Sequence, residues 1–145
     1  MIRDNLERAV QSGERDEEAR GNMLIAANLA ITIALGAVHA MSHPAGAQFG
    51  VPHGVANAIH LPHVIEHNAA GGPEIADRYR DIADIFDVSE PEVGPALAAH
   101  LTSLSERLGL PTRLSQVGVP EDGIPALVEG AMGDGTTLLN PREMG

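Results

Sequence analysis

The segment from Gly36 to His67 most constrains what this chain can fold into. It holds six of the seven histidines, set among glycines, prolines and small apolar residues. Histidine is the commonest protein ligand for metal ions, and its charge changes near neutral pH. Such a density in a chain rich in alanine and leucine predicts a metal-binding or proton-transfer site. The six residues are His39, His43, His53, His60, His63 and His67.

Apolar residues recur with the helical period from Met23 to Met41, which predicts one long helix over this range. His39 and His43 are four residues apart, so they would share one face of that helix. Pro44 disfavours helical geometry for the residue before it. We therefore expect the helix to end near Pro44 and residues 44–52 to form a loop.

A second helix is predicted to begin near His53 and to run towards Asn68, with a bend at Pro62. His53 would then lie in the first turn of this helix. A loop containing glycine before it would allow His53 to return beside His39. Two imidazoles presented by separate helices form half of a metal site.

The remaining sequence is also patterned as helix, and no segment alternates with the period of two that strands show. Ser89, with Glu92 three residues later, has the pattern of a helix N-cap. The predicted fold class is therefore all-α, a helical array. Its further helices are expected at residues 1–12, 74–86, 89–108 and 124–132, with residues 110–114 as a connector and 136–142 as a tail.

The composition supports one helical domain over residues 1–145. Apolar residues make up 43% of the chain, but only three residues are aromatic, so the core must be aliphatic and rich in alanine. There is no cysteine, which excludes disulfides and thiolate metal sites. The apolar run from Leu24 to Val38 is shorter than the roughly 20 residues that span a membrane. The charged start does not resemble a signal peptide, so we expect a cytoplasmic protein.

The chain is strongly acidic, with a net charge of −11. It contains nine arginines and no lysine. This charge argues against nucleic acids and anionic membranes as partners. An excess of acid with no lysine is typical of proteins from salt-loving organisms. An acidic protein encoded by a GC-rich genome would have the same composition, and the two explanations stay open.

The histidine-rich segment closely resembles the signature of the iron-containing (group III) alcohol dehydrogenases. A weaker resemblance extends from residues 2–6 to residues 140–142. It implies the fold of the second, metal-binding domain of the dehydroquinate synthase-like and iron-containing alcohol dehydrogenase proteins. The residues that carry the signature are Leu35 to Pro44, Gly46, Val51 to Ile59, Leu61 to Val64, and Asn68.

By this resemblance, His39 and His53 are two of four protein ligands to a divalent metal. The metal is usually Fe²⁺, with Zn²⁺ or another divalent ion as alternatives. His43 would lie beside the nicotinamide and the reacting alcohol without binding the metal, so it is both the expected catalytic residue and the expected cofactor contact. The implied reaction is hydride transfer between a small alcohol or aldehyde and NAD or NADP.

Two parts of the family pattern are missing from these residues. One is the nucleotide-binding α/β domain, and the other is an Asp and a His four residues apart that complete the ligand set. We therefore expect a truncated enzyme that is inactive alone, with an upstream nucleotide-binding half or a second copy as its protein partner. The alternative is a non-catalytic helical remnant, or a metal-binding or interaction module, from a decayed or split gene.

The other histidines are expected to have no part in the chemistry. His63 is predicted to support the helix bend, and His60 and His67 are predicted to lie on the surface. His100 is predicted to be an ordinary helix residue.

Overall fold

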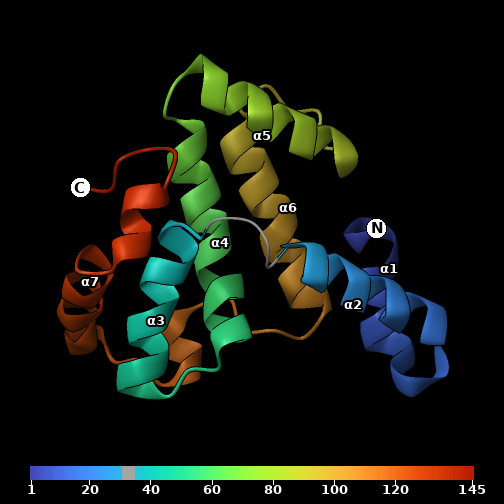
Figure 1. The fold of residues 1–145 in the computed structure, drawn as a ribbon, viewed down its shortest axis with the longest axis horizontal. Helices are drawn as coiled ribbons and strands as arrows, with labels where there is room; N and C mark the ends of the chain where they lie inside the picture. The colour runs from blue at the N-terminus through green and yellow to red at the C-terminus, as the bar shows by residue number, and fades with distance from the viewer. Residues whose placement is uncertain (31–34) are drawn as a thin grey trace. The chain divides into compact units, whose positions relative to one another are not determined.

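A computed structural model describes residues 1–30 and 35–145, and these residues contain helices and no strand (Figure 1). The predicted all-α class is confirmed. The α-helices are α1 Ile2–Ser12, α2 Glu17–Ala30, α3 Ala37–Phe49, α4 His53–Ala69, α5 Pro73–Ile85, α6 Val93–Arg107 and α7 Ile124–Met132. Short 3₁₀ helices are η1 Gly13–Arg15, η2 Leu114–Val117, η3 Glu121–Gly123 and η4 Gly135–Leu139. No helix of the described residues is long and apolar enough to cross a membrane.

The chain divides into two compact units, Met1–Ala34 and Leu35–Gly145. The first unit contains α1 and α2, which are joined through a polar contact. Asn5 is buried in α1, and its side-chain oxygen accepts a hydrogen bond of 3.1 Å from Asn22 of α2. Asp16 caps the start of α2 by accepting the backbone N–H of Ala19 at 3.0 Å. That residues 1–145 form a single domain stays a prediction.

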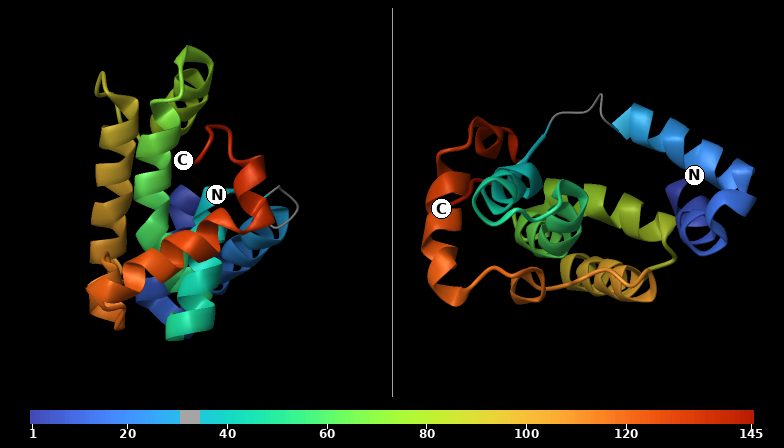
Figure 2. Two further views of the ribbon diagram at one scale, coloured as in Figure 1. Left: turned by 90° about the vertical axis from the view of Figure 1, so that its left-hand side faces the viewer. Right: turned by 90° about the horizontal axis from the view of Figure 1, so that it is seen from below.

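The second unit is built around α4, which packs against α3, α5 and α6, while α3 also packs against α7 and η4 (Figures 1 and 2). Small residues allow these helices to approach closely. A Cβ added to Gly94 of α6 would lie 2.8 Å from the Cβ of Ala69 in α4. Leu97 of α6 is fully buried. The predicted aliphatic, alanine-rich core is present, with buried alanines at positions 37, 40, 45, 56, 83 and 98.

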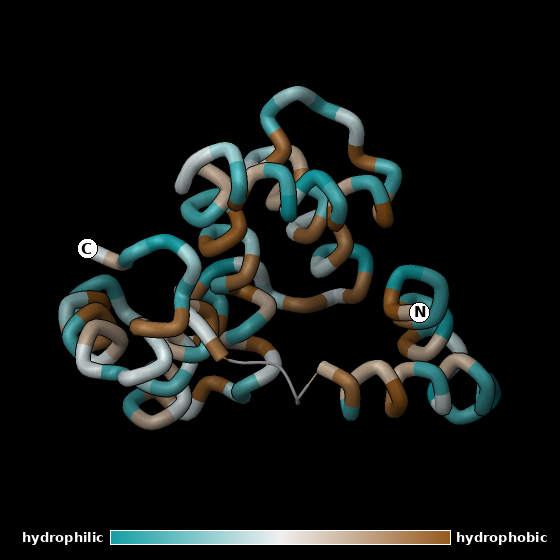
Figure 3. Tube along the Cα trace, turned by 45° about the horizontal axis from the view of Figure 1, so that its top comes forward, coloured by the Kyte–Doolittle hydropathy of each residue, from teal (hydrophilic) through white to brown (hydrophobic). Residues whose placement is uncertain are grey.

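Hydropathy varies along each helix of the second unit, as expected for helices with one buried face (Figure 3). In α7, Leu127 and Ala131 are buried while Val128 and Met132 are about half exposed. A cluster of buried residues from α3, α4 and α7 and from the segments that join them makes up much of this core. Its members are Ala45, Val51, Ala56, Val119 and Leu127, with Phe49, Val55, Leu114 and Val117 packed against them.

A pair of asparagines links the C-terminal segment to α3 and α4, and through Tyr79 to α5. Asn140 donates to the side-chain oxygen of Asn68 in α4 at 2.6 Å, and Asn68 donates back at 3.2 Å. The same oxygen of Asn140 accepts the backbone N–H of Ala37 at the start of α3, at 3.4 Å. Asn68 also donates to the hydroxyl of Tyr79 in α5 at 3.1 Å. These bonds satisfy buried polar groups and connect three helices to the predicted tail, part of which forms η4.

Several predicted boundaries are confirmed. The segments predicted as helix at residues 1–12, 74–86 and 124–132 correspond to α1, α5 and α7, and the predicted helix from His53 corresponds to α4. Pro62 lies inside α4 as expected. The prediction of Ser89 as an N-cap is wrong, because α6 begins at Val93 and its N-cap residue is Glu92.

The prediction that Pro44 ends its helix is also wrong, since α3 continues through it to Phe49. A proline inside a helix removes one hydrogen bond and costs about 3 kcal/mol. Pro44 is buried, and a Cβ added to Gly130 of α7 would lie 2.8 Å from its own Cβ. This close packing against α7 offsets the lost bond. The loop is therefore only the short turn between α3 and α4.

The long helix predicted from Met23 to Met41 is not one element. Helix α2 ends at Ala30, and α3 begins at Ala37 after Gly36, whose backbone is extended. Residues 31–34 of that prediction lie outside the described residues. His39 consequently belongs to the first turn of α3 and not to the end of a longer helix.

His60 was predicted to lie on the surface, and this is wrong. Its side chain is 7% exposed, and its Nε2 has no hydrogen-bond partner among the described residues. Burial lowers the pKa of His60 to about 4, with a further contribution from the charge of His63. The residue is therefore neutral in the folded protein at neutral pH. His67 is half-buried, with Nε2 3.1 Å from the carbonyl oxygen of Glu143.

We predict that Gly94→Ala destabilises the second unit by about 1–3 kcal/mol. Alanine favours a helix over glycine by about 1 kcal/mol, but its Cβ would overlap that of Ala69 on a helix that cannot move aside. Urea denaturation followed by circular dichroism measures the change. Gly21→Ala in α2 is the matched control, because a Cβ there meets no described atom within 4 Å, and it should be stabilising. A stabilising Gly94→Ala would contradict the close packing of α4 and α6.

We predict that His60→Leu stabilises the folded protein, because it removes a buried nitrogen that lacks a partner, worth roughly 1–3 kcal/mol. The gain should depend on pH. The pKa of His60 is about 4 in the folded protein and near its ordinary 6.5 when unfolded. Between these values the unfolded state binds more protons, so the parent protein loses stability as pH falls through this range. The gain from leucine should therefore be larger at pH 5 than at pH 8. Equal gains at both values would show that His60 is not buried in its neutral form.

Candidate functional site

Three histidines of the predicted site come together at the facing surfaces of α3 and α4. His39 lies in the first turn of α3, His43 lies one turn later, and His53 is the first residue of α4. The ring centroids are 5.2 Å apart for His39 and His53, 5.7 Å for His43 and His53, and 6.0 Å for His39 and His43. The expectation that His53 lies beside His39 is thus met, although the connection differs from the predicted loop.

The tight turn between α3 and α4 produces this arrangement. Gly50 ends α3 in the left-handed conformation, with φ of 67°, and its N–H returns to the carbonyls of the last helical turn. Val51 is buried and donates its N–H to the carbonyl of Ala45 at 3.3 Å. Pro52 then precedes His53 with the extended backbone that starts α4. Glycine suits the left-handed position because it has no Cβ.

The spacing of His39 and His53 suits two ligands of one metal ion. Two imidazoles bound to a tetrahedral ion at about 2.0–2.1 Å place their ring centroids about 5 Å apart, and the observed value is 5.2 Å. Among the described residues, no group of three or more histidine, cysteine or carboxylate side chains is arranged to hold a metal ion.

The surroundings favour the neutral form of His39. Burial lowers its pKa most, the neighbouring His53 and His43 lower it further, and Asp134 opposes them. A neutral imidazole keeps a lone pair on one ring nitrogen, which metal binding requires. His43 and His53 are more exposed than His39.

A carboxylate that the sequence did not single out bonds to His43. The Oδ2 of Asp134 lies 2.7 Å from Nδ1 of His43. The other carboxylate oxygen accepts the backbone N–H of Thr136 at 2.8 Å and its hydroxyl at 2.7 Å. The bond to His43, followed by those from Thr136, lowers the pKa of Asp134 to about 2, so this group is ionised at neutral pH.

No role was predicted for Asp134 from the sequence, and Thr136 was placed only in the predicted tail of residues 136–142. The signal that they bond to each other is local, since an Asp followed two residues later by a threonine donor is a common turn pattern. The bond to His43 had no such signal, because 91 residues separate the two side chains. Packing of α7 against α3 brings them together.

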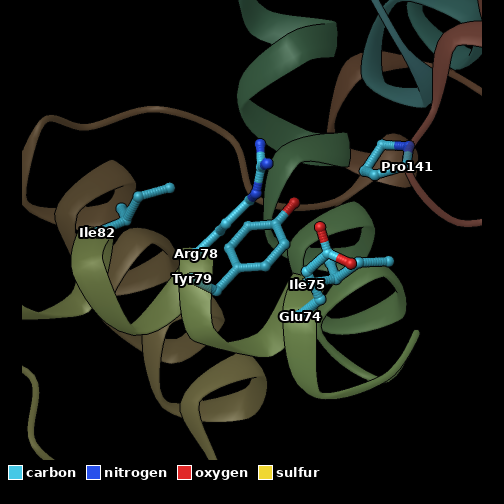
Figure 4. Close-up of a pocket in the computed structure, with 6 residues that line it drawn as sticks. All are labelled: Glu74, Ile75, Arg78, Tyr79, Ile82 and Pro141. Carbon is cyan, nitrogen blue, oxygen red and sulfur yellow. The ribbon is translucent and has the colours of Figure 1, made fainter.

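A separate groove lies on α5 and carries none of the predicted site residues (Figure 4). It has a volume of about 500 Å³, with the carboxylate of Glu74 and the guanidinium of Arg78 among apolar side chains. Its other lining residues are Ile75, Tyr79, Ile82 and Pro141.

Known proteins are similar to this chain over almost its whole length. Residues 1–145 match the family model described as "Fe-containing alcohol dehydrogenase family, C-terminal". The chain is 40% identical over 139 residues to lactaldehyde reductase of Escherichia coli K12, covering 91% of this chain and 36% of that protein. It is 38% identical over 152 residues to 1,3-propanediol dehydrogenase of Klebsiella pneumoniae, covering 99% and 38%.

A solved structure of a 1,3-propanediol oxidoreductase superposes on the chain with a TM-score of 0.86 at 37% identity. The match covers 99% of this chain and 39% of that one. This chain therefore spans little more than a third of the length of the relatives it matches. It belongs to the Fe-containing alcohol dehydrogenase family, in which it corresponds to the C-terminal, all-α part.

Proposed function

We propose that this chain supplies the metal-binding helical part of an NAD(P)-dependent alcohol dehydrogenase. The reaction is hydride transfer between a small alcohol or aldehyde and the nicotinamide. The observation that carries the proposal is the 5.2 Å separation of His39 and His53 across the α3–α4 turn. The relatives support the substrate class, because their names include lactaldehyde reductase, 1,3-propanediol dehydrogenase and an NADPH-dependent butanol dehydrogenase.

His39 and His53 would hold the metal, with Fe²⁺ as the expected ion because of the family. The ion would supply Lewis acidity, which lowers the pKa of an alcohol oxygen. Imidazole nitrogen is a suitable donor for Fe, Zn and related ions. The chain's contribution would be to hold the two imidazole rings with their centroids 5.2 Å apart on two helices that pack against each other.

His43 is the proposed proton acceptor and cofactor contact. Its side chain is 43% exposed, so a substrate or a nicotinamide can reach the ring. It lies one helical turn from His39, with 6.0 Å between the ring centroids, so it would be close to the metal. By the family resemblance it would not bind the metal itself. A histidine with a free ring nitrogen is well suited to take the proton that the alcohol hydroxyl releases.

Two groups needed for the complete reaction must come from elsewhere. One is a site for the pyrophosphate of the nucleotide, and the other is the remainder of the ligand set. A segment homologous to the upstream part of the relatives, carried by a longer form of this protein or by a separate chain, would supply both.

A second candidate is a metal-binding or interaction module with no dehydrogenase activity. The lack of a third ligand near His39 and His53 within the described residues favours it. The two candidates differ in whether an upstream half restores activity.

We predict that the chain alone binds Zn²⁺ or Co²⁺ weakly, through His39 and His53. Each change, His39→Ala or His53→Ala, should weaken binding more than about tenfold, because it halves the pair of donors. Isothermal titration at pH 8, where imidazole is neutral, measures the affinity. His63→Ala is the control, as this residue is exposed on α4 outside the cluster. Retention of the ion by the double variant would refute the assignment of the ligands.

We predict that alcohol oxidation appears only when the chain is mixed with an upstream half. That half would be taken from a relative such as the lactaldehyde reductase, with Fe²⁺ added without oxygen and NAD or NADP supplied. Hydride transfer requires reacting atoms held about 3–3.5 Å apart, which the chain alone cannot achieve without a nucleotide site. His39→Ala and His53→Ala should each reduce activity by about 100-fold or more, whereas His63→Ala should not. Activity of the chain alone, or activity in the mixture with both ligands replaced, would contradict the proposal.

A further inference from the structure

We propose that Asp134 is a positioning residue that fixes the orientation and the tautomer of His43. In this arrangement Nδ1 carries the ring proton and Nε2 presents its lone pair to the substrate. The inference rests on the proposed function for the identity of the proton donor, but the geometry of the pair stands independently of it.

The bonds around Asp134 determine which nitrogen carries the proton. An ionised carboxylate can only accept hydrogen bonds. Because Oδ2 of Asp134 lies 2.7 Å from Nδ1 of His43, that nitrogen must donate. In a neutral imidazole, the other nitrogen is then the acceptor. His43 is thus set to take a proton at Nε2.

Thr136 holds the carboxylate in place. Both its backbone N–H and its hydroxyl donate to Oδ1 of Asp134, at 2.8 and 2.7 Å. Oδ2 is thereby directed towards α3. Asp134 is 19% exposed at its side chain, less than His43 at 43%, so the carboxylate is the more buried member of the pair.

The packing of α3 against α7 brings the two side chains within bonding distance. Pro44, the neighbour of His43, lies so close to Gly130 that an added Cβ would be 2.8 Å from it. After α7, the hydroxyl of Thr137 donates to the carbonyl of Ala131 at 2.7 Å and holds the turn that carries Asp134. The bond to His43 therefore follows from the packing of α3 against α7 and η4.

In alcohol oxidation, His43 would accept the proton of the alcohol hydroxyl. The O–H bond of the alcohol breaks, its electron pair stays on oxygen, and the proton forms a bond with Nε2 of His43. The ring becomes an imidazolium, whose charge the neighbouring carboxylate of Asp134 stabilises. A bound oxidised nicotinamide would accept the hydride from the alcohol carbon, so that it would be reduced as the alcohol is oxidised to the carbonyl compound. Reduction of an aldehyde follows the same path in reverse, with His43 donating.

The decisive variant is Asp134→Asn, which keeps the shape of the side chain. The two donors of Thr136 still require an acceptor, so the amide oxygen should remain facing them. The amide NH₂ then faces His43, and Nδ1 must become the acceptor. We expect His43 to change from the tautomer protonated at Nδ1 to that protonated at Nε2. A residue that only stabilised the fold would not produce this exchange.

The tautomer is measured by ¹⁵N NMR of the full chain labelled at histidine, at about pH 9, where the imidazole rings are neutral. His43→Gln identifies the signals, and Asp84→Asn, an exposed residue of α5, controls for the lost charge. Thr136→Val, which removes the hydroxyl donor and keeps the backbone one, should leave Nδ1 protonated. A protonated Nε2 in the unsubstituted chain, or no change in Asp134→Asn, would overturn the inference.

The reconstituted mixture then separates this inference from the proposed function. Asp134→Asn should lower kcat by roughly 10²–10⁴-fold with little change in KM, as loss of a general base or of its orienting carboxylate does. Exchange of the tautomer in a mixture that has no activity would support the positioning role and contradict the dehydrogenase. Unchanged kcat together with an exchanged tautomer would overturn the role of Nε2 as the proton acceptor.

Discussion

The close packing of α3 against α4 and α7 is the constraint on which the rest of the second unit depends. Gly130 allows α7 to lie against Pro44, and the Gly50 turn allows α4 to return directly beside α3. One contact brings Asp134 to His43, and the other brings His53 to His39. The same helix thus contributes to both halves of the cluster, and its position sets every distance within it.

Small residues make such packing possible in a chain with few aromatic side chains. Helices approach closely where alanine and glycine replace larger side chains. The close contacts between their atoms then supply van der Waals attraction that aromatic side chains supply in other protein cores. The same close contacts make the core intolerant of added atoms, as at Gly94 and Gly130. Two hydrogen bonds between the side chains of Asn68 and Asn140 connect the end of α4 to the C-terminal segment.

His60 in α4 is buried and His39 in α3 is partly buried, and the two histidines differ in their surroundings. His60 lies among packed helices without a partner for Nε2, which is a cost in stability. His39 lies beside His53, and its lowered pKa favours the neutral form of the ring. What distinguishes His39 is a second imidazole ring, that of His53, with its centroid 5.2 Å away across the α3–α4 turn.

The sequence by itself determined the all-α class and the approximate extents of α1, α4, α5 and α7, because these follow from local periodicity. That His53 would lie beside His39 was expected from a connection that turns back between their helices, and their shared role was expected from the family resemblance. Only the tertiary structure decided that α3 continues through Pro44, that His60 is buried and that Asp134 bonds to His43. The reason is physical: each depends on contacts between segments far apart in the sequence, where packing energy outweighs local preference. A local sequence pattern does not indicate which distant helix will pack against a given residue.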